Sequence, residues 1–100
     1  MGGKEHLLFE RIEHELELLQ RHTIVLQKVI DGMPIGIRKI ADETNIPEHK
    51  IRYSLRVLEQ KGMITPTQYG ASPTEKAIKF KQQLGERIKN ITDQLQQLSE

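Results

Sequence analysis

The chain has no cysteine and no tryptophan, and phenylalanine and tyrosine together supply only four aromatic residues in 100. The absence of cysteine excludes disulfide bonds, thiolate zinc ligands and cysteine nucleophiles. Few aromatic residues combined with 29% charged residues favour helices with long amphipathic faces over a core built on aromatic rings. We therefore expect one small, mainly helical domain.

Long apolar runs are also lacking. No stretch approaches the roughly 20 apolar residues that a membrane-spanning helix requires. The first residues, Met1 to His6, contain no apolar core of a signal peptide. We expect a cytoplasmic protein that does not associate with membranes.

The charges nearly balance, with 15 lysine and arginine residues against 14 acidic ones and a net charge of +1. This balance is not typical of a protein that coats DNA without regard to sequence. Residues 1–31 hold four basic and six acidic residues, residues 32–71 hold six and four, and residues 72–100 hold five and four. The middle of the chain is therefore mildly basic, which is consistent with a local surface that faces phosphates.

A first helix is predicted from about residue 4 to residue 30. Its apolar stripe alternates spacings of three and four residues, which is a heptad pattern, and consists of Phe9, Ile12, Leu16, Leu19, Thr23, Leu26 and Ile30. A second stripe of Leu18, Val25 and Val29 widens the apolar face, so we expect the helix to be exposed or bound to a partner early and buried in a core late. Periodicity leaves open whether these residues form one helix or two. Gly32 is predicted to cap the helix, and Pro34 prevents its continuation.

Two shorter helices are predicted next, after an extended segment over residues 34–37. The first covers residues 37–44, and Asn45 after it tolerates the left-handed conformation of a tight turn. Pro47 presets the backbone for the second helix, over residues 48–61, and Gly62 ends that helix. Its inward residues are predicted to be Ile51, Ser54, Leu55 and Leu58.

A β-hairpin and a last helix complete the chain. Residues 63–67 and 71–72 are predicted strands, and Gln68, Tyr69 and Gly70 supply the turn between them. The segment from Ser72 to Glu75 has the pattern of a capping box, with Pro73 at the first helical position. The helix that follows, to about residue 99, carries a second heptad stripe of Leu84, Ile88, Ile91, Leu95 and Leu98.

The order of helix, short strand, helix, turn, helix and hairpin is that of a winged helix-turn-helix. The stretch from Ile35 to Ile64, with its apolar pattern, its turn and its ending Leu58-Glu59-x-x-Gly62-x-Ile64, resembles small archaeal winged-helix predicted transcriptional regulators. The resemblance covers about residues 20–80 and implies an all-α fold with a small β-hairpin wing, flanked by long amphipathic helices. We expect an N-terminal helical extension over residues 1–21, the winged domain over residues 22–73 and a coiled-coil-like dimerisation helix over residues 74–100.

A helix that enters the major groove needs hydrogen-bond donors on its outer face and an inner face fixed by packing. The outward residues of the helix over residues 48–61 are His49, Lys50, Arg52, Tyr53, Arg56 and Gln60. Arg52 and Arg56 lie one turn apart, and arginine reads guanine edges through two hydrogen bonds. Arg38, Lys39, Thr65 and Thr67 suit anchoring to phosphates. The predicted DNA-binding residues are Arg38, Lys39, His49, Lys50, Arg52, Tyr53, Arg56, Thr65 and Thr67. Whether the wing touches DNA is left open, because its tip has no lysine or arginine.

The two heptad stripes exceed what a winged domain of roughly 60 residues covers with its own core. They must pack against each other, against a second chain, or both. A homodimer is favoured because two-fold symmetry places two DNA-reading helices at half-sites one helical turn apart. The predicted dimerisation residues are Phe9, Ile12, Leu16, Leu84, Ile88, Ile91, Leu95 and Leu98.

Metal and catalytic chemistry have little support. His6, Glu10 and His14 share one helical face, but no further ligand or supporting shell accompanies them, so a solvated charged face is favoured. No glycine-rich phosphate loop and no pairing of a nucleophile with a base are recognisable. We expect no enzyme activity, no cofactor and no small-molecule ligand.

The predicted function is sequence-specific binding of double-stranded DNA by a homodimeric transcription regulator. The main alternative is a winged-helix protein-interaction module in a transcription or replication assembly. A third, an architectural chromatin protein, is disfavoured by the small net charge.

Overall fold

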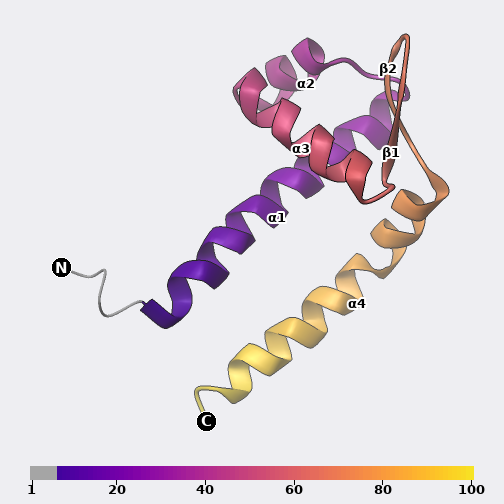
Figure 1. Cartoon of the computed structure of the whole chain (residues 1–100). Coiled ribbons are helices and arrows are strands. Elements are labelled where there is room, and N and C mark those ends of the chain that lie inside the picture. The colour runs from indigo at the N-terminus through magenta and orange to yellow at the C-terminus, as the bar shows by residue number, and fades with distance from the viewer. Residues whose placement is uncertain (1–6) are drawn as a thin grey trace.

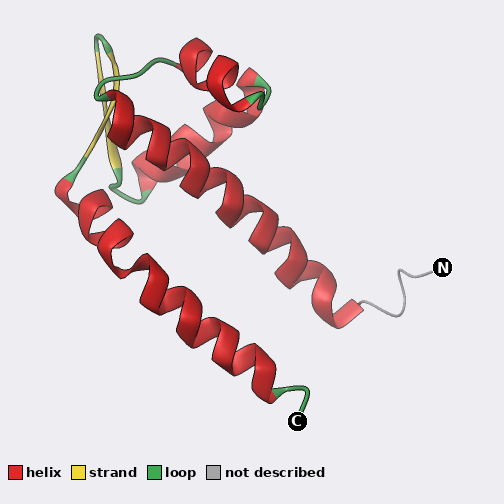
Figure 2. Cartoon of the chain, turned by 180° about the vertical axis from the view of Figure 1, so that it is seen from behind, coloured by secondary structure: helices red, strands yellow, loops and turns green. Residues whose placement is uncertain are grey.

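The computed structural model describes residues 7–100, and in this part the chain forms four helices and one two-stranded antiparallel sheet (Figure 1). The elements are α1 (Leu7–Gly32), α2 (Ile37–Thr44), α3 (Glu48–Gln60), β1 (Ile64–Thr67), β2 (Gly70–Pro73) and α4 (Glu75–Gln97). Figure 2 shows the hairpin as the one β-element of this otherwise helical part of the chain. The predicted mainly α-helical fold with a small hairpin is confirmed. No helix within residues 7–100 is both long and apolar enough to cross a membrane.

Helix α1 is continuous from Leu7 to Gly32, so the region forms one helix and not two. The hydroxyl of Thr23 donates to the carbonyl oxygens of Leu19 and Gln20, both at 2.9 Å, which satisfies this polar side chain without a break in the helix. The helix ends at Gly32, as predicted, but Gly32 is its last residue and has no positive φ, so it does not cap the helix in the left-handed conformation. This position requires glycine for space, since a Cβ atom there would lie 2.8 Å from the Cβ atom of Ile35.

The turn between α2 and α3 follows the sequence prediction. Asn45 has φ 60° and ψ 21°, the left-handed conformation, and its amide donates to the carbonyl oxygen of Ala41 at 2.8 Å. The hydroxyl of Thr44 accepts from the amide of Ile46 at 3.2 Å, and Pro47 is the N-cap of α3. Gly62, with φ 77°, turns the chain away after the helix. The turn therefore fixes α3 against α2 through local backbone geometry.

The hairpin pairs Ile64 with Pro73 and Thr67 with Gly70. Ile35, in the predicted extended segment, joins it through two backbone hydrogen bonds with Ala71, of 3.1 Å and 2.9 Å. A Cβ atom at Gly70, whose φ is 128°, would lie 2.5 Å from the carbonyl oxygen of Ile35. Glycine is therefore required where the chain between α1 and α2 crosses the hairpin.

The predicted capping box at the start of the last helix is wrong. Ser72 and Pro73 both belong to β2, where Ser72 pairs with Thr65, so the hairpin holds them extended. The N-cap of α4 is Thr74, whose hydroxyl accepts from the amide of Ala77 at 3.4 Å and donates to the carbonyl oxygen of Gly62 at 2.6 Å. Strand pairing thus shifts the start of the helix by two residues.

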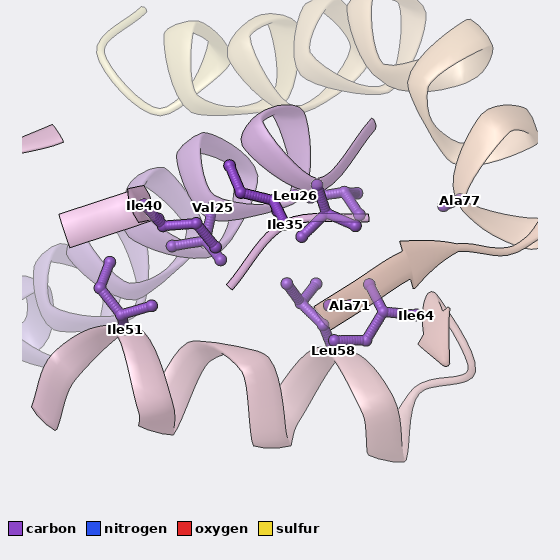
Figure 3. Packing of buried hydrophobic residues seen from close by; sticks show 10 residues of the cluster. Val25, Leu26, Ile35, Ile40, Ile51, Leu58, Ile64, Ala71 and Ala77 are labelled. Atoms are coloured by element: carbon purple, nitrogen blue, oxygen red, sulfur yellow. The ribbon is translucent and has the colours of Figure 1, made fainter. Parts of the chain in front are cut away.

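The core lies where the last turns of α1 meet α2, α3, the hairpin and the start of α4 (Figure 3). Its buried hydrophobic residues are Val25, Leu26, Val29, Ile35, Ile40, Ile51, Leu58, Ile64, Ala71 and Ala77. Each fully buried valine, leucine or isoleucine side chain of this core stabilises the fold by about 1.5–3 kcal/mol. The first turns of α1 and most of α4 lie outside this core and extend from it in the same direction (Figures 1 and 2). The prediction that α1 is exposed early and buried late is confirmed.

Candidate nucleic-acid interface

Helix α3 has one fixed face and one exposed face. Ile51, Ser54 and Leu58 are buried against the core, and Leu55 is half-buried. All six predicted outward residues are exposed, namely His49, Lys50, Arg52, Tyr53, Arg56 and Gln60. Because the inner side chains are held by packing, the outer donors project from a rigid helix.

A partly buried hydrogen bond joins α3 to α1. The Oγ atom of Ser54, which is 0% exposed, lies 2.8 Å from Nδ1 of His22 on α1. Burial lowers the pKa of His22, and the neighbouring positive charge of Arg21 lowers it further, which outweighs the opposite effect of Glu15. Sequence reasoning missed this pair, although a serine at an inward helical position signals that a polar partner is needed.

Tyr53 lies at the edge of the outer face of α3. Its ring centroid is 5.9 Å from that of His22, and the guanidinium carbon of Arg21 is 6.0 Å from the centroid of the tyrosine ring. The structure thus places the tyrosine ring beside α1. Tyr53 is still 44% exposed, so part of its ring is available at the junction of α1 and α3.

The two arginines of the outer face differ in their surroundings. Arg52 forms an ion pair with Glu48, with 3.7 Å between Nη2 and Oε1. Arg56 forms no ion pair with any residue of the described range. An exposed pair of this kind contributes at most about 1 kcal/mol, but it must be broken before the guanidinium meets another anion. Arg56 is therefore the better placed of the two for a new contact.

The candidate phosphate anchors lie on α2 and β1. Arg38, Lys39 and Thr65 are exposed. The hydroxyl of Thr67 donates to the carbonyl oxygen of Gly70 at 2.6 Å and accepts from the amide of Tyr69 at 3.1 Å. Thr67 thus stabilises the hairpin turn, and its donor is already engaged.

Tyr69 stands at the tip of the hairpin and is 74% exposed. The sequence pattern indicated only a turn residue here. Tyr69 exposes its phenol ring and hydroxyl at this tip, where lysine and arginine are missing.

No family model matches the chain, and no curated protein matches it either. Within residues 7–100, no three histidine, aspartate or glutamate side chains cluster in a way that would hold a metal ion. His6, part of the weighed metal-binding pattern, lies outside the described residues. The surface of α3 and the two long helices are the features of the described residues that point to a function.

The predicted dimerisation residues are left uncovered by the chain itself. The exposed fractions lie between 43% and 73% for Phe9, Ile12 and Leu16 on α1, for Ile88, Ile91 and Leu95 on α4, and for Leu98 at the C-cap of α4, and Leu84 is half-buried. Packing of the two stripes against each other within one chain does not cover them in this structure. Apolar surface of this extent usually marks an interaction site.

Proposed function

We propose that this chain is a winged helix-turn-helix transcription regulator, of the small archaeal kind that its sequence resembles, and that it binds double-stranded DNA sequence-specifically as a homodimer. The observation that carries the proposal is the two-sided construction of α3. Ile51, Ser54 and Leu58 hold its inner face, while Arg52, Arg56 and their neighbours face outward. A helix that enters the major groove needs this combination of rigidity and exposed donors.

In this proposal α3 reads bases and α2 positions the domain on the backbone. Arg56, which has no acidic partner among the described residues, contacts a guanine edge through two hydrogen bonds. Arg38 and Lys39 contact phosphates, which fixes the register without reading sequence. Because the net charge of the chain is only +1, its affinity for DNA depends on these local contacts and on their presence in both copies of the dimer.

A protein-interaction module is the second candidate, favoured by one specific observation. The chain has two tyrosines, Tyr53 on α3 and Tyr69 at the tip of the hairpin, and both are exposed. Tyrosine is enriched in the centres of protein–protein interfaces.

Selection of bound sequences from a random pool of duplex DNA, with the full chain, tests the proposal. We expect an enriched motif with two-fold symmetry and half-sites about one helical turn, roughly 34 Å, apart. The Arg56→Gln variant is the matched control, since it removes the charge from one exposed position and should lose enrichment at one base per half-site. Binding that enriches no motif would favour an architectural role, and absence of salt-dependent binding would favour the protein-interaction module.

A further inference from the structure

The two helices that leave the core carry opposite charge. Residues 7–20 of α1, here called the acidic arm, contain four glutamates and one arginine. Helix α4 contains five lysine and arginine residues and three acidic residues. Both carry an exposed apolar stripe, and both extend from the core in the same direction (Figures 1 and 2).

An apolar groove runs along α4 from its junction with α1 and α3. A first cavity of about 370 Å³ is lined mainly by apolar residues, among them Leu19, Val57 and Phe80. A second, of about 250 Å³, shares Leu19 and Phe80 with the first and continues past Ile88 and Ile91. The two together form the groove, because they share these walls.

The charged side chains that line the groove are all positive. Lys61 and Lys76 line the first cavity and Arg87 lines the second, and no aspartate or glutamate of the described residues lines either. None of the three forms an ion pair within residues 7–100. A groove with an apolar floor and only positively charged side chains at its edges suits a helix that carries an apolar stripe with acidic residues next to that stripe.

The chain's own acidic arm does not fill this groove. Leu19 is the one arm residue that lines it, and Phe9, Ile12 and Leu16 remain 46–53% exposed. These three residues form a stripe flanked by Glu13 and Glu15 at the adjoining heptad positions. The arm thus has the apolar and acidic character that the groove requires, but it is not used within its own chain.

We propose that the acidic arm of a second copy of this chain occupies the groove, with its Phe9–Ile12–Leu16 stripe on the apolar floor and its glutamates beside Lys61, Lys76 and Arg87. This rests on the homodimer of the proposed function and specifies how it forms. Pairing of α4 with α4 would join two helices that are both net positive, whereas pairing of the arm with α4 joins a net negative segment to a net positive helix. Two-fold symmetry repeats the contact and closes the dimer.

The arrangement ties dimerisation to the geometry of α3. Val57 and Lys61, at the C-terminal end of α3, line the groove, so the bound arm would touch α3 directly. The distance between the two copies of α3 is then set by arm and groove, and not by a flexible linker.

Cross-linking tests the pairing, and the absence of native cysteine makes each introduced thiol unique. Full-length chains carrying either Ile12→Cys or Ile88→Cys, distinguished by a size tag on one of them, are mixed and treated with a short bismaleimide. We expect the mixed I12C–I88C product to exceed both self-linked products. His14→Cys and Glu86→Cys, on the opposite faces of the same two helices, are the matched controls and should give little product.

Sedimentation of the unaltered chain separates the possible failures. A monomer at tens of micromolar, an order-of-magnitude choice for a weak coiled coil, would overturn the homodimer and this inference with it. A dimer in which I12C–I12C or I88C–I88C products dominate would leave the homodimer standing and overturn the pairing of arm and groove.

Charge reversal is an independent readout. The double substitution Glu13→Lys and Glu15→Lys, at two exposed positions, should lower the affinity of dimerisation about tenfold or more, because it places lysines beside the positively charged edges of the groove. Adding Lys76→Glu and Arg87→Glu should restore most of the affinity. If the second pair of changes does not restore it while circular dichroism shows intact helices, the pairing is wrong.

Discussion

The Nδ1 atom of His22 lies 2.8 Å from the Oγ atom of Ser54, and this contact joins α1 to α3 inside the structure. Ser54 is fully buried, so its hydroxyl has no access to water and depends on the imidazole. The contact lies between the acidic arm of α1 and the exposed face of α3. The two helices are therefore held together by a specific polar contact as well as by apolar packing.

Ser54→Ala should lower the free energy of unfolding by about 1–2 kcal/mol. The substitution leaves the imidazole of His22 without its partner at a partly buried site, and an unmade hydrogen bond of this kind costs about that amount. Urea denaturation followed by circular dichroism measures the change. Ser99→Ala, at an exposed serine near the end of α4, is the control and should be neutral. Equal stability of the two variants would show that the contact contributes nothing.

Stability should fall as the pH drops below about 6.5, the ordinary pKa of histidine. Burial and Arg21 hold the pKa of His22 below that value in the folded chain, so the unfolded chain takes up the proton first. The stability that depends on a neutral His22 is fully present above the pKa that this histidine has in the unfolded chain. It is lost as the pH falls through the lower pKa that His22 has in the folded chain. Comparison of urea midpoints between about pH 5 and pH 8 for the unaltered chain and for His22→Gln isolates it. An identical pH slope in both proteins would contradict the assignment.

Gly70→Ala should destabilise the chain by about 1–3 kcal/mol, since the new Cβ atom would meet the carbonyl of Ile35 at a backbone conformation that alanine rarely adopts. Gly85→Ala is the matched control. Gly85 lies within α4 with nothing within 4 Å of the added Cβ atom, so alanine there should stabilise by about 0.5–1 kcal/mol. Thermal melts of the two variants should shift in opposite directions.

Arg56→Ala should weaken binding to a selected DNA site by about 1–3 kcal/mol and relax the preference at one position per half-site, with an unchanged melting temperature. Arg52→Ala should reduce the affinity less, because its guanidinium is already paired with Glu48.

Lys39→Ala should weaken the binding of selected and scrambled DNA alike and reduce the slope of log affinity against log salt by roughly one. Titrations at several salt concentrations separate these effects, and an equal loss on both DNAs from Arg56→Ala would mean that α3 does not read sequence.

Local signals in the sequence predicted the centre of the fold well. The bounds of α2 and the left-handed Asn45 are as predicted, because each depends on residues close together in the chain. The hairpin turn is as predicted at Gln68 and Tyr69, whereas Gly70 pairs with Thr67 as the first residue of β2. The cap predictions at Gly32 and at Ser72 differ from the structure, and both positions lie near the contact between residues 33–36 and the hairpin. There a pairing between distant segments overrides a local capping pattern.

The sequence by itself determined which residues of α3 face outward, because helical periodicity and the apolar positions leave only one way to bury that helix. It did not determine that Tyr53 packs toward α1, that Arg52 is paired while Arg56 is not, or that His22 meets Ser54. It also predicted two apolar stripes, but not how much of each the chain itself leaves exposed. Only the tertiary structure decided these, because they depend on how α1 crosses α3 and how α4 leaves the hairpin, and such angles are set by packing among residues far apart in the chain.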